Sequence, residues 1–540
     1  MTIGPGCALW SRRLPAPGRL DALVLGPTGL DHYERLLDRP DRPWRRRATV
    51  SAMATGPGRL VRHGRSLLAL VPEGDRVVEY LLSSGRWVPA GVVAAAGPAQ
   101  AEASDPALPW ADQPRPRTVA RVEGSPFALV DEEGSVFSYR RGADGTWERD
   151  SCLRLVDPEP FVASPQESGK LAQVTGDLDA TPTPWGQRAA TLSRSLTAAG
   201  IRGTDLGVRV DHGGRTFLLF GDTHWTRPWL ATRDAIAEVV DPSDTRPAVQ
   251  FHGAPVKLVG HAAGRVTMRE YDVPLDGFSE GGHLHVFFSS NHFRGGRVMG
   301  RSVLARAVDA DPVVDGGARR RPVRFEVLGT FSARHFINVS VQRRPASAVP
   351  GWSGHGDVLL VWGTGPYRAS EVRLAAVEPA APLRPRYWAG DGWSESEADA
   401  RPLFRPAALG ELSVRWSEEA GRYLMLTASA PEEDIGNAVV LRAAGEPWGP
   451  WSPRIRLLDW VVTGMSLDPH TRFIRATRDD EHVGDRIFRA QASGTGAAYA
   501  PYLFDTAVDG DDLVLRYTLS TWNPYQVVLM RHRLPLALLA

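Results

Sequence analysis

From about residue 200 to its end, the sequence is a succession of short segments in which apolar and polar residues alternate, each bounded by Gly, Pro or Asp. Examples are RTFLLFGD, HLHVFFSS, DVLLVWG and YQVVLMRHRL. A period of two residues is the pattern of a β-strand that buries one face. Many short strands at even spacing favour a closed all-β architecture. The longer breaks group the strands into five sets, so we predict a five-bladed β-propeller over residues 201–540.

The first 165 residues carry a threefold repeat of their own. Each copy has an apolar strand, a turn, an alternating strand that ends in Tyr, and then a Trp; the copies are ALVLGPTGLDHYER, LALVPEGDRVVEYL and FALVDEEGSVFSYR. Each copy is typical of a β-hairpin, and we predict a smaller β-repeat module, either a partial propeller or lectin-like. Tyr33, Tyr80 and Tyr139 are interpreted as packing residues rather than sugar-stacking surfaces. Residues 166–200 are predicted to be a linker, with a short helix over 188–199.

The composition excludes several classes of partner. The 63 Lys and Arg residues balance 62 Asp and Glu residues, so no bulk field draws the chain to nucleic acid or to an anionic membrane. No apolar run approaches the roughly 20 residues that cross a bilayer, and we expect no membrane insertion. Cys7 and Cys152 alone cannot build a disulfide framework. Because the first residues lack the apolar run of a secretory signal, we expect a cytoplasmic or non-classically exported protein.

In a propeller, the starts of the innermost strands meet at one mouth of a central channel. We expect these starts near Asp205, Gly281, Asn338, Glu411 and Thr463. Asp205 in GTDLGV and Glu411 in GELSVRW each follow a Gly-containing turn and precede an alternating strand. Glycoside hydrolysis needs one ionised carboxylate and one carboxyl group of raised pKa. We predict Asp205 as base or nucleophile and Glu411 as acid; the alternative for each is that it only holds a turn.

Further polar and aromatic side chains are expected around the same mouth. Asp222 and Asp234, at the ends of the next strands of the first blade, are predicted to support Asp205 or to bind sugar hydroxyls. A carbohydrate groove combines aromatic faces with hydrogen-bond donors. The predicted substrate-binding residues of this kind are Arg368, Tyr367, Trp393, Trp388 and His335.

Metal and cofactor chemistry find little support in the sequence. His283 and His285 lie on one face of a predicted strand, but no third ligand stands at a zinc spacing. The glycine-rich turns contain no Gly-Lys-Ser/Thr phosphate loop, and no Gly-x-Ser-x-Gly elbow is present. We therefore predict no metal and no cofactor.

From about Thr204 to Pro453, several strings occur in an order that resembles the domain-of-unknown-function 4185 family. They are TDLGV, FGDT, RDAIA, GRSVLARAVD, FINVSV, WGTGPYRASEVRLA, GELSVRW and PWGPWS. The resemblance implies a five-bladed propeller of the glycosidase type, in a family that includes endo-D-arabinanases acting on the arabinan of mycobacterial cell walls. It also implies acids at Asp205 and Glu411, with support from Asp222, Asp234 and Arg368.

Three functions remain open from the sequence. The leading hypothesis is a glycoside hydrolase that cleaves a furanose-containing polysaccharide, with D-arabinan as the candidate polymer. The alternative is a propeller that binds a polysaccharide or oligosaccharide without cleaving it, and the third is an interaction propeller with no sugar ligand. Because a fold does not fix a function, the site must decide between them.

Overall fold

The protein is described here from a computed structural model. The structure describes the chain apart from residues 1–6, 13–18, 27, 37–43, 57, 64–65, 75, 84, 96–117, 123–124, 133–134, 142–146, 155–160, 183–187, 228–232, 243–245, 261–267, 269–271, 291–298, 310–320, 366, 368–369, 405–409, 429–437, 460–497, 522–524 and 540. The chain divides into two compact units. The first comprises mainly Met1–Asp157, and the second comprises Pro158–Pro431 with Ile435–Ala540. The division therefore falls earlier than the predicted boundary at residue 165.

The described residues of the first unit form three four-stranded sheets, each a simple antiparallel meander. Their strands are β1 (Cys7–Arg12), β2 (Arg19–Gly26), β3 (Gly29–Leu36) and β4 (Arg45–Ser51); β5 (Arg59–His63), β6 (Ser66–Glu73), β7 (Arg76–Ser83) and β8 (Arg86–Ala95); and β9 (Thr118–Val122), β10 (Ser125–Glu132), β11 (Ser135–Arg141) and β12 (Trp147–Arg154). The three sequence repeats form the hairpins β2–β3, β6–β7 and β10–β11. Tyr33 is buried, and the Tyr80 hydroxyl donates to Glu73 Oε1 at 2.6 Å. The side chain of Tyr139 lies outside the described part.

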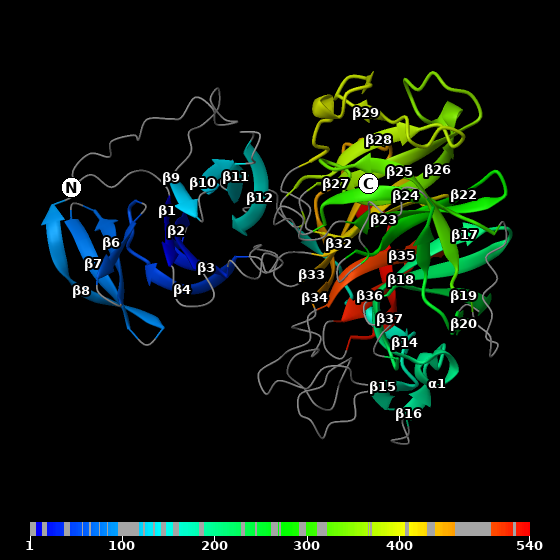
Figure 1. Cartoon of the computed structure of the whole chain (residues 1–540), viewed down its shortest axis with the longest axis horizontal. Helices are drawn as coiled ribbons and strands as arrows, with labels where there is room; N and C mark the ends of the chain where they lie inside the picture. Colours follow the sequence, from blue (N-terminus) through cyan, green and yellow to red (C-terminus); the bar gives the residue numbers. More distant parts are fainter. Residues whose placement is uncertain are drawn as a thin grey trace. The chain divides into compact units, whose positions relative to one another are not determined.

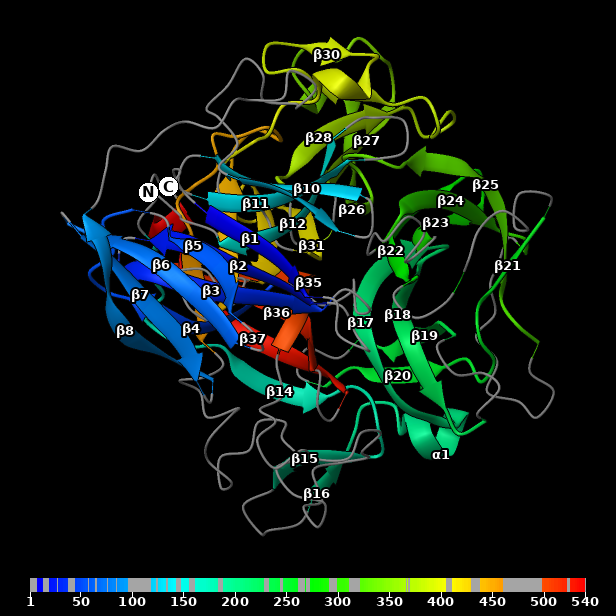
Figure 2. The ribbon, with the colours of Figure 1, turned by 60° about the vertical axis from the view of Figure 1, so that its left-hand side comes forward.

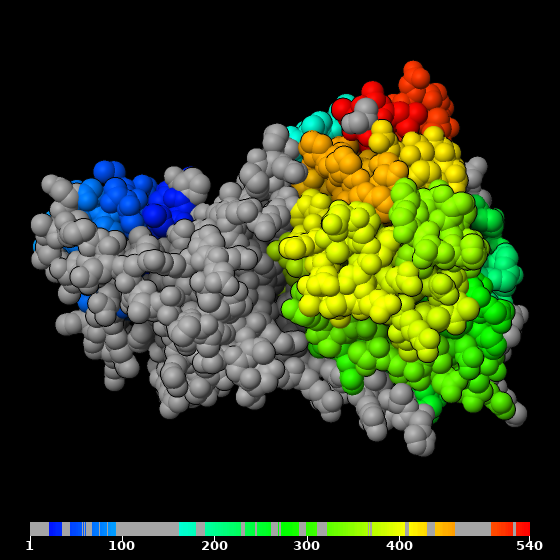
Figure 3. Space-filling view, turned by 90° about the horizontal axis from the view of Figure 1, so that it is seen from above, coloured from blue at the N-terminus to red at the C-terminus, as the bar shows by residue number. Residues whose placement is uncertain are grey.

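The second unit is a β-propeller, whose sheets follow one another in chain order (Figure 1). In the space-filling view, the surface of this unit changes from green through yellow and orange to red as the chain proceeds (Figure 3). Its described residues form five large sheets: β17 (Ile201–His212), β18 (Arg215–Trp225), β19 (Ala235–Asp241) and β20 (Ala248–Phe251); β22 (Pro274–Glu280), β23 (His283–Ser290), β24 (Arg301–Ala307) and β25 (Arg324–Ser332), with β21 (Lys257–Val259) beside β25; β26 (Asn338–Pro345), β27 (Asp357–Thr364), β28 (Arg373–Val377), β29 (Arg386–Trp388) and β30 (Trp393–Ser394); β31 (Leu412–Ser417), β32 (Arg422–Ala428), β33 (Ala438–Ala444) and β34 (Ile455–Asp459); and β35 (Ala498–Asp509), β36 (Asp512–Thr521) and β37 (Val527–Pro535).

The first strands of these five sheets form a closed ring. β17 contacts β22, β22 contacts β26, β26 contacts β31, β31 contacts β35, and β35 contacts β17. Apolar clusters fill the spaces between sheets, as the alternating sequence requires. One cluster joins the first three sheets, and three others lie between the third and fourth, the fourth and fifth, and the fifth and first. Polar groups at the starts of the five first strands are thereby brought to one end of the ring.

The segment predicted to be a linker completes the ring instead. β14 (Gly169–Gln173) pairs antiparallel with β37 (Figure 2), and β13 (Val162–Ala163) pairs parallel with β34. Both ends of the second unit therefore contribute to its last two sheets. The predicted helix over 188–199 is also corrected: residues 188–190 are the strand β16 (Arg188–Ala190), paired with β15 (Leu178–Pro182), and only α1 (Ser195–Ala199) is helical.

One of the predicted inner-strand starts is wrong, and another lies outside the described residues. The second inner strand is β22, which begins at Pro274, whereas Gly281 lies in the turn between β22 and β23 with φ +56°. Thr463 is outside the described residues. The third inner strand does begin at Asn338, and the fourth begins at Leu412, directly after Glu411. Within the described part of the chain, no helix has the length and apolar character needed to cross a membrane.

A buried histidine links the two ends of the propeller. His532 of β37 hydrogen-bonds through Nε2 with Ser164 Oγ at 2.8 Å and through Nδ1 with Ser168 Oγ at 3.0 Å. Its side chain is fully buried, and this burial lowers the pKa of His532 to about 4. The imidazole is therefore neutral in the folded protein at neutral pH, so each ring nitrogen can pair with one serine hydroxyl.

This histidine predicts a loss of stability in acid. In the unfolded chain a histidine titrates near pH 6.5, so between about pH 6.5 and pH 4 the unfolded state binds a proton that the folded state does not. The free energy of unfolding therefore falls as the pH is lowered through this window, by up to about 3 kcal/mol. His532→Gln should reduce this pH dependence, measured by urea unfolding at pH 7 and pH 4.5. His355→Gln, the same change on the surface, is the matched control, and equal slopes in the two variants would contradict the prediction.

Candidate active site

Asp205 lies inside β17, where the strand departs from regular pairing with β18. The register shifts on both sides of this residue, between Gly203 and Asp205 and between Leu206 and Val208. Irregularities of this kind redirect a side chain out of the regular alternation. Gly221 stands opposite Asp205, and a Cβ atom there would lie 2.9 Å from Asp205 Oδ1 and 2.5 Å from Val273 Cγ1. The glycine of FGDT is thus required by the close approach of Asp205 and β22.

The Asp205 carboxylate is buried and held on one side only. The hydroxyls of Tyr499 and Tyr525 each donate to Asp205 Oδ2 at 2.9 Å. Oδ1 is buried and has no hydrogen-bond partner among the described residues. Because buried polar atoms are nearly always paired, Oδ1 is the atom left for a substrate or a proton.

Burial and charge together set the ionisation of Asp205. Desolvation raises the pKa of Asp205 to about 7, the two tyrosine hydrogen bonds oppose this rise, and the negative charge of Glu411 adds to it. A carboxyl group with a pKa near neutrality can hold or release a proton under ordinary conditions. The two acids singled out in the sequence therefore interact in the folded protein.

Glu411 stands directly before β31, after Gly410, whose φ is +137°. The hydroxyl of Tyr367 donates to Glu411 Oε1 at 3.0 Å. The ring of Tyr367 packs closely against Gly410: a Cβ atom at position 410 would lie only 3.0 Å from Tyr367 Cε2. The pKa of Tyr499 is raised by burial and by its electrostatic interactions with Asp205, Glu411 and Tyr367. This tyrosine therefore stays protonated and can donate a hydrogen bond. The structure thus brings Asp205, Glu411 and Tyr367 together.

A second group of acids lies beside Asp205. The backbone N–H of Asp222 donates to the Asp234 carboxyl group, and burial, Asp205 and Asp272 raise the pKa of Asp234 well above its usual range. Burial and the neighbouring negative charges therefore favour the neutral form of Asp234. Asp272, which is fully buried, was not singled out in the sequence. Within the described residues, no group of three or more His, Cys, Asp or Glu side chains is placed to hold a metal ion.

Backbone strain gathers at this site. Six described non-glycine residues have positive φ, and four of them surround Asp205: Leu206 (71°), Asp222 (40°), Ala500 (52°) and Tyr525 (70°). Leu206 follows Asp205 directly, and Ala500 follows Tyr499. Each such conformation costs on the order of 1–3 kcal/mol and persists at sites where function requires it. The strain marks this end of the ring independently of the acids.

The remaining predicted binding residues lie elsewhere. Trp388 and Trp393 are on β29 and β30, the outermost strands of the third sheet. Trp388 stacks on Trp448 at 4.1 Å between ring centroids, and Trp393 meets Trp352 edge-on at 5.5 Å. These tryptophans form an aromatic cluster of their own rather than joining Asp205 and Glu411.

His335 and Arg368 complete the predicted set. His335 lies between β25 and β26, and its backbone N–H donates to Glu397 Oε1 at 2.8 Å. Arg368 is outside the described residues.

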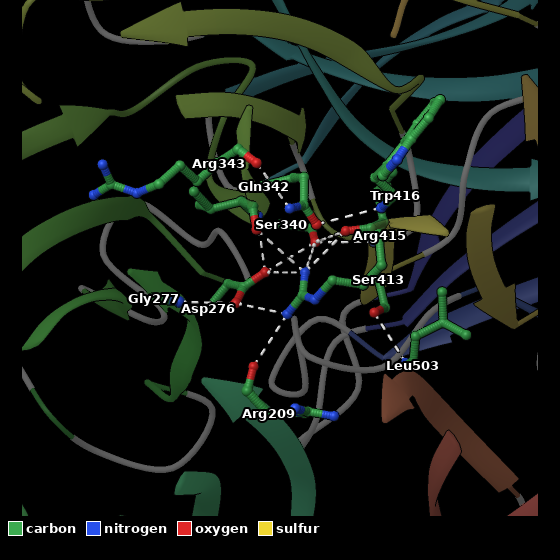
Figure 4. Close-up of polar contacts among 12 residues, drawn as sticks. Arg209, Asp276, Gly277, Ser340, Gln342, Arg343, Ser413, Arg415, Trp416 and Leu503 are labelled. Carbon is green, nitrogen blue, oxygen red and sulfur yellow. Dashed lines mark hydrogen bonds and ion pairs between the residues drawn. The ribbon is translucent and has the colours of Figure 1, made fainter. Parts of the chain in front are cut away.

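Four residues beyond Asp205 and Glu411 along the chain, Arg209 and Arg415 belong to an ion-pair network that ties four inner strands together (Figure 4). Arg415 of β31 donates to both carboxylate oxygens of Asp276 on β22, at 2.9 and 3.0 Å. It also donates to the Arg209 carbonyl of β17 at 3.1 Å. Asp276 Oδ2 accepts further hydrogen bonds from the Ser340 hydroxyl and the Val341 N–H of β26. This network fixes the strands that carry the site.

The model of one protein family, described as a domain of unknown function (DUF4185), matches residues 191–531. A comparison with curated protein sequences gives no match.

Solved structures similar to this chain include several glycoside hydrolases. A thermostable family-43 glycoside hydrolase is 12% identical, with 61% of this chain and 89% of that chain covered and a TM-score of 0.32. The alpha-L-arabinofuranosidase from Podospora anserina, in complex with cellotriose, is 10% identical, with 68% and 99% covered and a TM-score of 0.34. An exo-beta-1,3-galactanase from Phanerochaete chrysosporium is 11% identical, with 67% and 64% covered and a TM-score of 0.35.

Proposed function

The chain belongs to the DUF4185 family, and from this premise we propose that it is a glycoside hydrolase that cleaves a furanose-containing polysaccharide, with Asp205 and Glu411 as its two carboxyl groups. The observation that carries the proposal is the pair itself. Two buried acids from the first and fourth sheets interact at one end of the ring, and burial raises the pKa of one of them to about 7. Glycosidases use such a pair across the scissile bond.

The roles within the pair follow from protonation. The raised pKa supports Asp205 as the group that carries the proton, which is the reverse of the roles predicted from the sequence. Asp205 would then donate its proton to the glycosidic oxygen as the bond from that oxygen to the anomeric carbon breaks. Glu411 would either bond to the anomeric carbon or take a proton from the attacking water. Asp222 and Asp234 would act through their electrostatic influence on the first sheet.

The substrate class rests on the family resemblance of the TDLGV, FGDT and GELSVRW strings, which implies D-arabinan and endo-action on it. The partner in this proposal is a polysaccharide or an oligosaccharide derived from it. The competing possibility is a propeller that binds the same glycan without cleaving it. Such a protein would bind the polymer but release no sugar from it.

The test is to incubate the purified full chain with D-arabinan, L-arabinan and β-1,3-galactan and to measure released reducing ends over time. The Asp205→Asn/Glu411→Gln double variant is the blank. We expect wild-type protein to release oligosaccharides from an arabinan and the blank to release none. Binding of the polymer by both proteins without release of sugar would support the binding propeller instead, and equal release by both would refute the assignment of the acids.

A further inference from the structure

Asp205 belongs to the first sheet, but its surroundings come largely from the fifth. Tyr499 is on β35, and Tyr525 stands two residues before the last strand, β37. Both hydroxyls converge on the same oxygen, Oδ2. Tyr525 is buried and Tyr499 is partly buried, and desolvation together with the charge of Asp205 raises the pKa of each well above its usual range. Each phenol is therefore a permanent hydrogen-bond donor at this position.

The backbone around Asp205 is fixed to the same sheet. The Thr204 N–H donates to the Tyr525 carbonyl at 3.1 Å, and the Leu206 N–H donates to Ser520 Oγ at 2.7 Å. These two contacts flank Asp205 in the chain. Gly207 has φ +90°, and a Cβ there would lie 3.2 Å from Thr518. Both the main chain and the side chain of Asp205 are thus positioned by the fifth sheet.

This arrangement makes the two carboxylate oxygens unequal. A carboxyl group that accepts two hydrogen bonds at one oxygen keeps that oxygen as an acceptor, because two O–H donors and a third proton cannot share it. The proton of a neutral Asp205 must then reside on Oδ1, the atom that has no hydrogen-bond partner among the described residues. The same geometry prevents rotation of the carboxylate, which would exchange the two oxygens.

From these contacts we propose that Tyr499 and Tyr525 are positioning residues that hold Oδ2 of Asp205 as an acceptor and leave Oδ1 as the atom that exchanges a proton with the substrate. The inference rests on the proposed function for its catalytic meaning. Among the described residues, the ionisable groups that interact with Asp205 include Tyr499, Tyr525 and Tyr502 of the fifth sheet, Glu411 before β31, and Asp234 before β19.

The test is a comparison of Tyr499→Phe and Tyr525→Phe with wild-type protein. Both hydrogen bonds favour the charged form of Asp205, so each substitution should raise the pKa of Asp205 by about one unit. The limb of the kcat/KM pH profile that reports Asp205 should move to higher pH by the same amount, with kcat lowered and KM little changed. The matched control is Tyr80→Phe, which removes a tyrosine hydroxyl from a buried carboxylate of the first unit and should leave the profile in place.

A second readout separates this inference from the proposed function. Asp205 can be titrated by NMR in protein labelled with ¹³C at the aspartate carboxyl carbons, and Asp205→Asn assigns its signal. A raised titration midpoint in the Phe variants of a chain that cleaves nothing would sustain the positioning role and end the hydrolase proposal. Folded Phe variants with an unmoved midpoint and an unmoved pH profile would overturn the positioning role.

Discussion

Arg415→Met is expected to lower the free energy of unfolding of the propeller by about 3–5 kcal/mol. The methionine can occupy much of the same volume, but it cannot donate to Asp276, whose side chain is only 2% exposed. The buried carboxylate would lose both bonds from the guanidinium and keep those from Ser340, Val341 and Gly277. An uncompensated buried charge, rather than lost packing, is the source of the cost.

A double variant tests this cause directly. Asp276→Asn/Arg415→Met removes the charge together with its partner, so it should regain part of the stability lost in Arg415→Met. Urea unfolding followed by tryptophan fluorescence measures the difference, with the transition of the second unit analysed separately because a chain of two units need not unfold in one step. A loss below about 1 kcal/mol in Arg415→Met would show that the strands hold together without the ion pair.

One sequence pattern locates part of the candidate site at the mouth of the propeller. An acid after a glycine and before an alternating strand marks the mouth of a propeller, and it identified Glu411. Asp272 stands two residues before β22 but follows Tyr271 rather than a glycine, so the pattern does not detect it. That strand was overlooked because PLDGFSE contains Pro, Asp and Gly, residues that are depleted in strands. Gly277 is there because a Cβ would lie 2.5 Å from the His285 carbonyl oxygen.

Contacts between distant segments explain the other differences. The sequence GKLAQ is compatible with a strand, but it does not show that the partner strand β37 lies at the other end of the chain. From the sequence alone, the segment is therefore predicted to be a linker. Tyr499 and Tyr525 have no local signature either, because their role depends on the fifth sheet meeting the first. Trp388 and Trp393 are residues of a type that can stack on a sugar ring. Only the strand order shows that they lie on the outermost strands of the third sheet.

Asp205→Asn is expected to lower kcat/KM for arabinan hydrolysis by on the order of 10²–10⁴-fold, while the affinity for the polymer changes little. Asparagine keeps the shape of the side chain and can still accept from both tyrosines, but it cannot give up a proton. Because the pKa of Asp205 is raised to about 7, the wild-type enzyme should be active below about pH 7 and lose activity above it if Asp205 is the acid. This limb should be missing from any activity that remains in Asp205→Asn.

The leaving group then distinguishes acid from base. An aryl glycoside of an arabinofuranosyl oligosaccharide releases a stable phenolate, so it needs no proton from Asp205. Asp205→Asn should therefore lose far less activity on the aryl glycoside than on arabinan, whereas Glu411→Gln should lose comparable activity on both, because a base or nucleophile is required in each case. The opposite pattern, with activity rising rather than falling through about pH 7, would restore Asp205 as the base. Both outcomes rest on the same physical cause: burial sets the pKa of Asp205 near 7, so its protonation changes within the pH range of the assay, and the direction of the activity change shows which form is needed.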